Sequence, residues 1–228
     1  MVKTCHSCPH LRSCLVAGLD EKGLQKISDS LRRYSVQGKG RALFNQGEPV
    51  AAFFFLCDGT VKLTHVLRNG DEVILDVKTA SSTLGKYKTP QQQSHFQSIV
   101  TASDSVDLGY IQADILQELL RDNPAFLQGL LNHLEDRSEI IYKRLACMKL
   151  RLRDRLLCLI ALTLPAKERE EIVVPFSNIE LAQLAQTTPE TISRTIHQLK
   201  AKGRVDISVA GSLKIKKRVL QEYLDQLA

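Results

Sequence analysis

The chain has 228 residues, of which 43% are hydrophobic, and this is enough apolar material for one large or two small cores. The longest uncharged apolar stretches, residues 50–57 and 156–165, are too short to span a bilayer, and no apolar run follows the first lysine. We therefore expect a cytoplasmic protein without a membrane partner. The net charge of +6 is compatible with a polyanionic partner.

Three of the six cysteines, Cys5, Cys8 and Cys14, lie within ten positions near the start of the sequence, in an arm predicted to span residues 1–19. In a reducing compartment such a group is typical of metal binding or redox chemistry rather than of structural disulfides. Soft thiolates spaced C-x2-C-x5-C can hold one iron-sulfur cluster. Three alternatives stay open: zinc bound together with His6 or His10, a reversible dithiol switch, or an arm that binds nothing.

Residues 20–122 are predicted to form a β-roll sensor domain. Between residues 42 and 108, short extended segments are separated by the turn signals Gln46-Gly47, Asp58-Gly59 and Asn69-Gly70. Because Asn69-Gly70 lies between two alternating apolar runs, it predicts a hairpin with a type I′ turn. The pattern indicates a β-rich barrel or roll.

Residues 123–152 are predicted to form a long dimerisation helix. Its apolar positions follow a 4-3-4-3 spacing that only Ser138 interrupts, and they are Leu127, Leu131, Leu134, Ile141, Leu145, Met148 and Leu152. This spacing is typical of a coiled-coil seam, and the charged residues beside it favour a partner helix. The alternative is a long helix packed on its own barrel. We expect a homodimer.

Residues 153–228 carry local signals for two short helices and a β wing. Ser177 and Glu180 form a capping box, and Thr188 followed by Pro189 provides an N-cap and a proline in the first helical position. Residues 206–217 read as a hairpin with Ala210-Gly211 at its tip. The sequence therefore predicts a winged helix-turn-helix domain.

Four residues of the second short helix are candidate DNA contacts: Thr188, Glu190, Ser193 and Arg194. The last three project from one side near its amino end, while Ile192, Ile196 and Leu199 form its apolar face. Arginine can donate two hydrogen bonds to guanine, and a carboxylate can accept one from cytosine. The alternative is that Glu190 only complements the helix dipole and pairs with Arg194. A dimer would place two such helices about 34 Å apart and would require a palindromic site.

The order of β-roll, long helix and winged helix, with TPETISR in the second short helix, resembles the Crp/Fnr family of bacterial transcription regulators over essentially the whole chain. The resemblance implies an α+β fold whose roll is a jelly roll like that of cyclic-nucleotide-binding domains. Residues 189–194, PETISR, are similar to the V-E-T-I-S-R motif of the FNR branch except in the first place. The match implies that Glu190, Ser193 and Arg194 read a TTGAT-N4-ATCAA-like palindrome.

The resemblance also bears on other partners. In the cyclic-nucleotide branch the roll carries a Gly-Glu pair and an arginine that neutralises the cyclic phosphate. The matching residues 84–100 contain neither arginine nor glutamate, so we expect no cyclic nucleotide and a solvated loop at Lys86 and Lys88. The resemblance also implies that residues 86–93 include the loop with which an activator of this family contacts RNA polymerase.

FNR-type oxygen sensors have the same amino-terminal cysteine spacing, so the resemblance implies a [4Fe-4S] cluster that stabilises the DNA-binding dimer and is destroyed by oxygen. The fourth cysteine of that branch corresponds to Val106 here, so the fourth ligand is open. The candidates are Asp104, Asp107, Asp136, Glu139, Cys57 and Cys147. We expect Cys57, Cys147 and Cys158 to be small buried hydrophobic side chains rather than ligands.

An enzyme is the rival from another class of protein. The Cys5-x-x-Cys8 pair could serve a thiol-disulfide oxidoreductase, but such motifs normally begin a helix after a strand, and no strand precedes this pair. No Ser/His/Asp set, paired-carboxylate site or P-loop stands out in the sequence. We expect a regulator without catalytic activity, and a thiol or zinc switch is the alternative to the iron-sulfur sensor.

Overall fold

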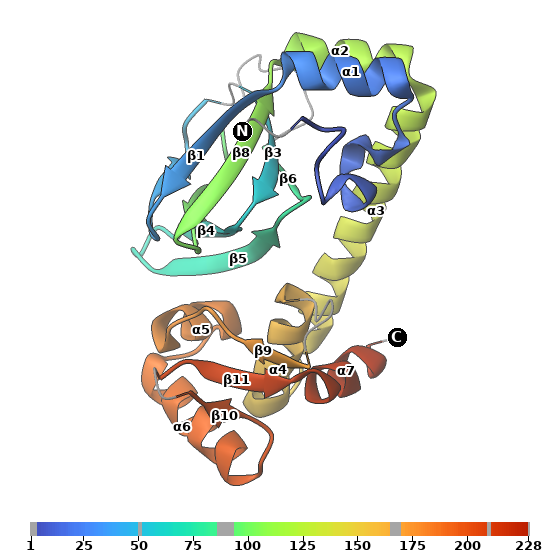
Figure 1. Ribbon diagram of the computed structural model, residues 1–228. Helices are drawn as coiled ribbons and strands as arrows, with labels where there is room; N and C mark the ends of the chain where they lie inside the picture. The colour runs from blue at the N-terminus through green and yellow to red at the C-terminus, as the bar shows by residue number, and fades with distance from the viewer. Residues whose placement is uncertain (1–3, 50–51, 86–93, 165–169, 209–210, 228) are drawn as a thin grey trace. The chain divides into compact units, whose positions relative to one another are not determined.

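The computed structural model describes residues 4–49, 52–85, 94–164, 170–208 and 211–227. Its contacts divide the chain into two compact units (Figure 1), the first formed by Met1–Val66 and Val77–Asp136 and the second by Leu67–Asp76 and Arg137–Ala228. Both helices and antiparallel strands are present, so the fold is α+β as predicted. No helix within the described segments is long and apolar enough to cross a membrane.

The predicted β-roll is present as two four-stranded sheets, with the strand orders β1-β8-β3-β6 and β2-β7-β4-β5. Strand β8 pairs antiparallel with both β1 and β3, and β7 pairs antiparallel with both β2 and β4. The strands are β1 (Arg32–Gln37), β2 (Ala42–Phe44), β3 (Phe53–Asp58), β4 (Thr60–Val66), β5 (Glu72–Thr79), β6 (Thr83–Leu84), β7 (Ser98–Thr101) and β8 (Ser105–Ile111). Antiparallel strands in two layers are typical of a jelly roll.

The hairpin between β4 and β5 forms at the predicted place, but its turn is not type I′. Gly70 has a positive φ of 88°, whereas Asn69 is not among the described residues with positive φ. The Gly70 amide donates to the Leu67 carbonyl, and the Leu67 amide donates to the Asp71 carbonyl. This is the longer loop in which a β-turn precedes a left-handed glycine, so only one residue needs the left-handed conformation.

Three helices and two short 3-10 turns accompany the roll: α1 (Glu21–Ser30), α2 (Ala113–Asp122), α3 (Pro124–Cys147), η1 (Leu11–Ser13) and η2 (Leu15–Gly18). The arm, residues 4–19, packs into a first apolar cluster with α1, α2 and the first half of α3, where Leu15 and Val16 meet Phe126 and Leu130. Figure 1 shows the arm in dark blue beside the amino half of α3. A second cluster, which contains Leu56, Val106 and Leu108, fills the interior of the roll.

Helix α3 ends at Cys147, whereas the heptad spacing predicts a helix that continues to Leu152. Residues 148–150 form successive turns, in which the amides of Met148 and Leu150 donate to the carbonyls of Leu145 and Cys147. A new helix, α4, begins at Leu152. The heptad spacing of apolar residues therefore continues past the end of α3. Such spacing predicts which side chains share a face of a helix, but it does not predict where the helix ends.

The carboxy-terminal part of the second unit contains α4 (Leu152–Thr163), α5 (Asn178–Ala185), α6 (Pro189–Ala201), α7 (Lys217–Asp225) and the strands β9 (Glu171–Val173), β10 (Asp206–Ile207) and β11 (Leu213–Lys216). The strands form a sheet in the order β10-β11-β9. Helix α4 is buried along most of its length, with Leu156, Leu157 and Ile160 at its centre. The sheet and α4 hold α5 and α6 in the arrangement of a winged helix-turn-helix.

Candidate functional site

The helix-turn-helix is fixed by the local signals that the sequence predicts. The Ser177 hydroxyl accepts a hydrogen bond from the Glu180 amide at 3.3 Å, and the Glu180 carboxylate accepts one from the Ser177 amide at 2.8 Å. This capping box starts α5. The turn that follows depends on Gln186, whose φ of 51° lies in the left-handed region and ends the helix within one residue.

Helix α6 starts at the predicted N-cap. The Thr188 hydroxyl accepts from the Thr191 amide at 3.3 Å, and Pro189 occupies the first helical position. The predicted apolar face of α6 is buried in the unit through Ile192, Ile196 and Leu199. The second short helix is therefore docked on its apolar side, which leaves the opposite side for a partner.

Glu190 and Arg194 are exposed on that opposite side and Ser193 is half-buried beside them. The hydrogen bond of the Glu190 carboxylate to its own amide, helped by the Thr188 hydroxyl, lowers the pKa of Glu190 below its usual value. Among the ion pairs of the described residues, none joins Glu190 to Arg194, so the Arg194 guanidinium is available to an acceptor outside the chain.

The predicted wing is present as the β10–β11 hairpin, and Gly211 has the left-handed φ of 80° expected near its tip. The other predicted tip residue, Ala210, lies outside the described residues. A groove of about 410 Å³ between α5, α6 and the wing is lined by Ser193, His197, Ile207 and Gly211, among others. The second helix and the wing therefore border one concave surface.

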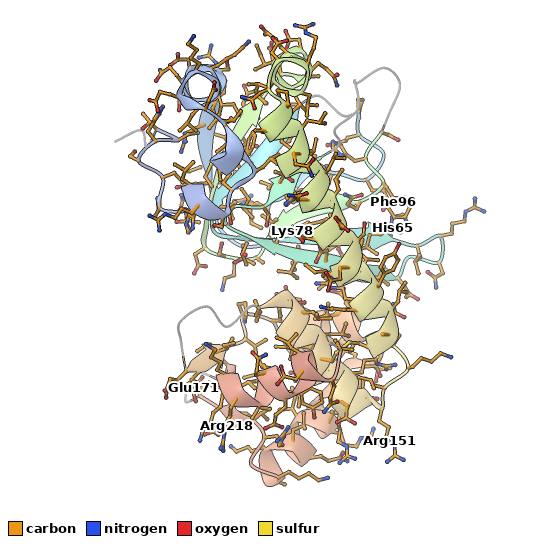
Figure 2. The ribbon with its side chains drawn as sticks, turned by 90° about the vertical axis from the view of Figure 1, so that its right-hand side faces the viewer. His65, Lys78, Phe96, Arg151, Glu171 and Arg218 are labelled. Carbon is orange, nitrogen blue, oxygen red and sulfur yellow. A yellow bond between two sulfur atoms is a disulfide. The ribbon has the colours of Figure 1, made fainter. Side chains whose placement is uncertain are left out.

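Residues 177–218 contain eight Lys and Arg against three Asp and Glu, so the local charge is positive. Some of these cations are held by carboxylates, as Lys214 is by Glu171 at 2.9 Å. Lys202, Lys216 and Arg218 are exposed, and Figure 2 labels Arg218 at the surface. Exposed cations around a docked helix are the electrostatic pattern of a protein that contacts phosphates.

The three arm cysteines are held by successive tight turns. The Cys8 amide donates to the Cys5 carbonyl at 3.2 Å, and the Cys14 amide donates to the Leu11 carbonyl at 3.1 Å. Cys5 is buried, and its amide donates to the Ser28 hydroxyl on α1 at 3.3 Å. The Cys5-x-x-Cys8 pair therefore lies in a turn and not at the start of a helix, unlike the motif of thiol-disulfide oxidoreductases.

One small cavity is lined by Cys5, Cys8, Cys14 and Cys57. The volume of this cavity is about 30 Å³. Its other lining residues include the apolar Leu11, Val16, Ile27, Leu31 and Phe55 and the polar Arg33 and His10. As predicted, Cys57 packs as a small apolar side chain against the first apolar cluster, although it is half-buried and not fully buried. Strand β3 carries it to the same cavity as the arm cysteines, from 43 residues further along the chain than Cys14.

The electrostatics of this cavity follow from its apolar lining. Burial raises the pKa of the Cys57 thiol to about 11, although the charge of Arg33 opposes this, and burial also raises the pKa of Cys14. The Arg33 guanidinium donates to the Cys5 sulfur at 3.5 Å. Because a thiol must lose its proton to bind a metal, binding of a metal by Cys14 and Cys57 would release protons.

The other candidates for a fourth ligand lie elsewhere. Asp104 is exposed and pairs with Lys39 at 3.9 Å, and Glu139 pairs with Lys143 at 2.6 Å. Cys147 is joined to Cys158 by a disulfide, which corrects the expectation of two free thiols. Both sulfurs are buried, and their Cα atoms are 6.4 Å apart, within bonding range.

Asp136 does not line the thiol cavity, whereas Asp107 lines an adjoining open cavity of about 390 Å³ together with Cys8, His10 and Cys57. Asp107 also accepts a hydrogen bond from the Ser35 hydroxyl at 2.5 Å. His6 contacts the Glu21 carboxylate at 3.2 Å. Within the described residues, no three or more His, Cys, Asp or Glu side chains are grouped as the ligands of a single metal ion.

The predicted seam of α3 carries exposed apolar side chains. Leu127, Leu131, Ile141 and Leu145 are between 42% and 63% exposed, although each is large and hydrophobic. Four of the seven apolar seam positions are therefore exposed in the single chain, whereas Leu134 packs against the first apolar cluster.

The stretch predicted to replace a phosphate cassette is described only in part, because Lys86, Lys88 and the rest of residues 86–93 lie outside the described residues. Beside it, the rings of His65 and Phe96 stack with centroids 4.3 Å apart, and Figure 2 shows them side by side. His95 is buried and stacks on Phe44 at 3.8 Å.

Comparisons with known proteins agree with this architecture. Residues 37–123 match the cyclic nucleotide-binding domain family, and residues 149–219 match the Crp-like helix-turn-helix domain family. The Electron transport regulator A of Shewanella oneidensis is 26% identical over 89% of this chain and 83% of its own. The Anaerobic regulatory protein of Pasteurella multocida is 22% identical over 89% of this chain and 76% of its own.

Among solved structures, the c-di-GMP-responsive global regulator CLP of Xanthomonas campestris superimposes with a TM-score of 0.71 at 18% identity, covering 86% of this chain and 99% of that one. At this identity the likeness concerns the fold. The two domain families occur here in the order, and on the elements, that the structure assigns to the β-roll and to the winged helix-turn-helix. The chain belongs to the Crp/Fnr family of DNA-binding transcription regulators.

Proposed function

We propose that this protein is a homodimeric transcription regulator that binds a TTGAT-N4-ATCAA-like palindrome when its arm cysteines hold an iron-sulfur cluster, and that oxygen or another oxidant ends this binding. The single observation that carries the proposal is the cavity in which Cys5, Cys8 and Cys14 converge beside the first half of α3. The names of the two relatives, which refer to electron transport and to anaerobic regulation, support it.

The DNA-reading part of the proposal assigns a role to each exposed residue of α6. Arg194 donates two hydrogen bonds to a guanine, Glu190 accepts from a cytosine, and Ser193 contacts a base or a phosphate. Thr188 caps the helix and keeps its amino end rigid at the bases. Like an unperturbed glutamate, Glu190 is ionised throughout the neutral range, so its carboxylate accepts hydrogen bonds and cannot donate them. The exposed Lys202, Lys216 and Arg218 would hold the backbone of the duplex.

In the proposed dimer, the exposed seam of α3 packs against the same seam of a second chain. An apolar stripe at heptad spacing is buried when two such helices pair, and a polar seam residue such as Ser138 weakens the pair while it fixes the register. A weak dimer is suited to a switch, because a small change in free energy then shifts the population between one and two chains. The paired α6 helices would face successive turns of the duplex.

The donor set of the arm fits an iron-sulfur cluster. Cysteine thiolates are the usual ligands of a [4Fe-4S] cluster, and most of the other residues that line the cavity are apolar. The cavity of about 30 Å³ adjoins the larger open one, with which it shares Cys8, His10, Arg33 and Cys57. The arm would move outward into this space on loading. When bound, the cluster would supply a group that oxygen oxidises.

A short path leads from the cysteines to the dimerisation helix. Cys14 directly precedes η2, whose Leu15 and Val16 pack with Phe126 and Leu130 of α3. A Cβ added at Gly18 would lie 3.3 Å from the Ala125 carbonyl oxygen, so arm and helix touch through their backbones. Release of Cys14 from its ligand role would loosen this packing and, with it, the first turns of the seam helix.

A thiol-disulfide switch is the second candidate, because the Cys147–Cys158 disulfide joins the end of α3 to α4. Reduction of this bond would change the connection between the seam helix and the DNA-binding helices. A regulator of this kind would respond to dithiothreitol in the absence of iron, whereas the cluster mechanism requires iron and sulfide.

Anaerobic purification tests the proposal. The iron and acid-labile sulfide content and the visible absorption are measured together with fluorescence anisotropy on a TTGAT-N4-ATCAA duplex and on a scrambled duplex, before and after air is admitted. We expect a coloured protein that prefers the palindrome and loses both colour and preference in air. A Cys8→Ala variant should lack both properties from the start. Binding that is equally tight without iron, or in air, would remove cluster sensing from the proposal.

A further inference from the structure

We propose that Cys57 is the fourth cluster ligand, supplied by strand β3 in place of the strand β8 position that is Val106 in this chain. This inference rests on the proposed function, because it assigns a residue to the same cluster. Cys5, Cys8, Cys14 and Cys57 line one cavity, and Cys57 packs against the apolar cluster that contains Cys5.

The two faces of β3 explain why Cys57 reaches the arm. Phe53 and Phe55 belong to the first apolar cluster, against which Cys57 packs, whereas Leu56 belongs to the second cluster inside the roll. Successive side chains of a strand point to opposite faces, so Phe53, Phe55 and Cys57 share the face on which the arm lies. Cys57 is half-buried on this face.

Val106 lies on the wrong face to replace it. Val106 is fully buried in the second cluster, together with Leu108, and it does not line the thiol cavity. Strand β8 is the direct neighbour of β3 in the sheet. The fourth thiol has therefore moved to an adjacent strand, which keeps it near the arm even though the family position holds a valine.

A β-bulge places Cys57 at the edge of the strand pairing. Leu56 pairs with Leu108 and Asp58 pairs with Asp107, so two steps along β3 match one step along β8, and Cys57 is the extra residue. A bulge bends the strand locally and redirects the side chain of the extra residue. The Cys57 backbone therefore lies outside the regular ladder between β3 and β8, and its thiol donates to the Phe55 carbonyl at 3.8 Å.

The lining of the cavity favours a thiolate-bound cluster at this place. Arg33 lines the same cavity, and its guanidinium donates to the Cys5 sulfur at 3.5 Å. A cation beside the ligands offsets the negative charge that four thiolates bring, and hydrogen bonds to ligand sulfurs stabilise a bound cluster. Asp107, the carboxylate rival in the adjoining cavity, already accepts from Ser35.

The test compares four proteins that are expressed and purified without oxygen: the wild type, Cys57→Ala, Asp107→Asn, and Cys57→Ala combined with Val106→Cys. Iron and sulfide per chain, the visible absorption and circular dichroism are measured on each. We expect about four irons and four sulfides per chain in the wild type and in Asp107→Asn. Cys57→Ala should retain less than half of this content, and Val106→Cys should not restore it.

A measurement without substitutions keeps the inference testable if Cys57→Ala does not fold. Apo and cluster-loaded wild type are alkylated with iodoacetamide under nitrogen, and the labelled cysteines are identified by mass spectrometry. We expect loading to protect Cys57 to the same extent as Cys5, Cys8 and Cys14.

The outcomes separate this inference from the proposed function. A wild type without iron and sulfide refutes both of them. A wild type with a full cluster that Cys8→Ala loses but Cys57→Ala keeps refutes only the role of Cys57. Labelling of Cys57 in the loaded protein at the rate of the apo protein also refutes it. Restoration of the cluster by Val106→Cys would refute only the claim that position 106 faces away from the cavity.

Discussion

Leu145→Ala is a direct test of the seam, because it separates dimer formation from folding. In the single chain Leu145 is 63% exposed, so the folded unit uses little of its side chain. Full burial of a leucine contributes about 1.5–3 kcal/mol, and roughly 1–2 kcal/mol of this is still available to a partner helix in each chain. Both chains lose it, so we expect the dimer to weaken by about 2–4 kcal/mol, or roughly 30- to 1,000-fold in Kd.

The assay is sedimentation of the anaerobic, cluster-loaded protein over a range of concentrations, with thermal unfolding as the measure of folding. Leu67→Ala is the matched control, since Leu67 is 43% exposed and lies outside α3. We expect this control to dimerise like the wild type, and neither variant to lose much unfolding free energy. If Leu145→Ala dimerises as tightly as Leu67→Ala, the exposed stripe of α3 is not the dimer interface.

Four further substitutions address the DNA-binding and coupling elements. Arg194→Ala should weaken binding to the palindrome by about 1–3 kcal/mol and relax the preference for guanine at one position. Lys202→Ala should instead weaken binding to every duplex to the same extent and lower the slope of log K against log salt concentration by about one. Fluorescence anisotropy on the palindrome and on base-substituted duplexes at several salt concentrations distinguishes the two effects. Ser177→Ala removes the capping box of α5 and should lower the unfolding free energy by about 1 kcal/mol, with Gln198→Ala as a control for an exposed polar side chain of the same domain. Val16→Ala removes buried methyl groups where the arm meets α3, so it should lower the unfolding free energy by about 1–3 kcal/mol. It should also weaken dimerisation of the anaerobic protein without lowering its iron content. An unchanged Kd of the dimer would contradict the coupling between the arm and α3.

The helix-turn-helix could be predicted in detail because its signals are local. Ser177 with Glu180 and Thr188 with Pro189 satisfy amides within the first turn of their own helices, so the caps need no distant partner. The buried face of α6 follows in the same way from the helical period of Ile192, Ile196 and Leu199.

Strand β9 was missed because its formation depends on a distant partner. The segment Glu171–Val173 has only three residues, which is too short to show the alternating pattern of a strand. It is extended because β11 pairs with it. The type of the Asn69-Gly70 turn was missed for a related reason. The flanking strands fixed a longer loop, in which Gly70 alone takes the left-handed conformation.

The cysteine site shows where sequence information ends. The arm spacing by itself indicated three ligands, whereas residues 50–57 are a continuous apolar run that does not distinguish the two faces of a strand. Nothing along the chain says what covers either face, because strand periodicity assigns a side and not a neighbour. Only the packing of the arm and α1 against β3, which depends on contacts between residues far apart in the sequence, brought Cys57 to Cys5, Cys8 and Cys14 and left Val106 inside the roll.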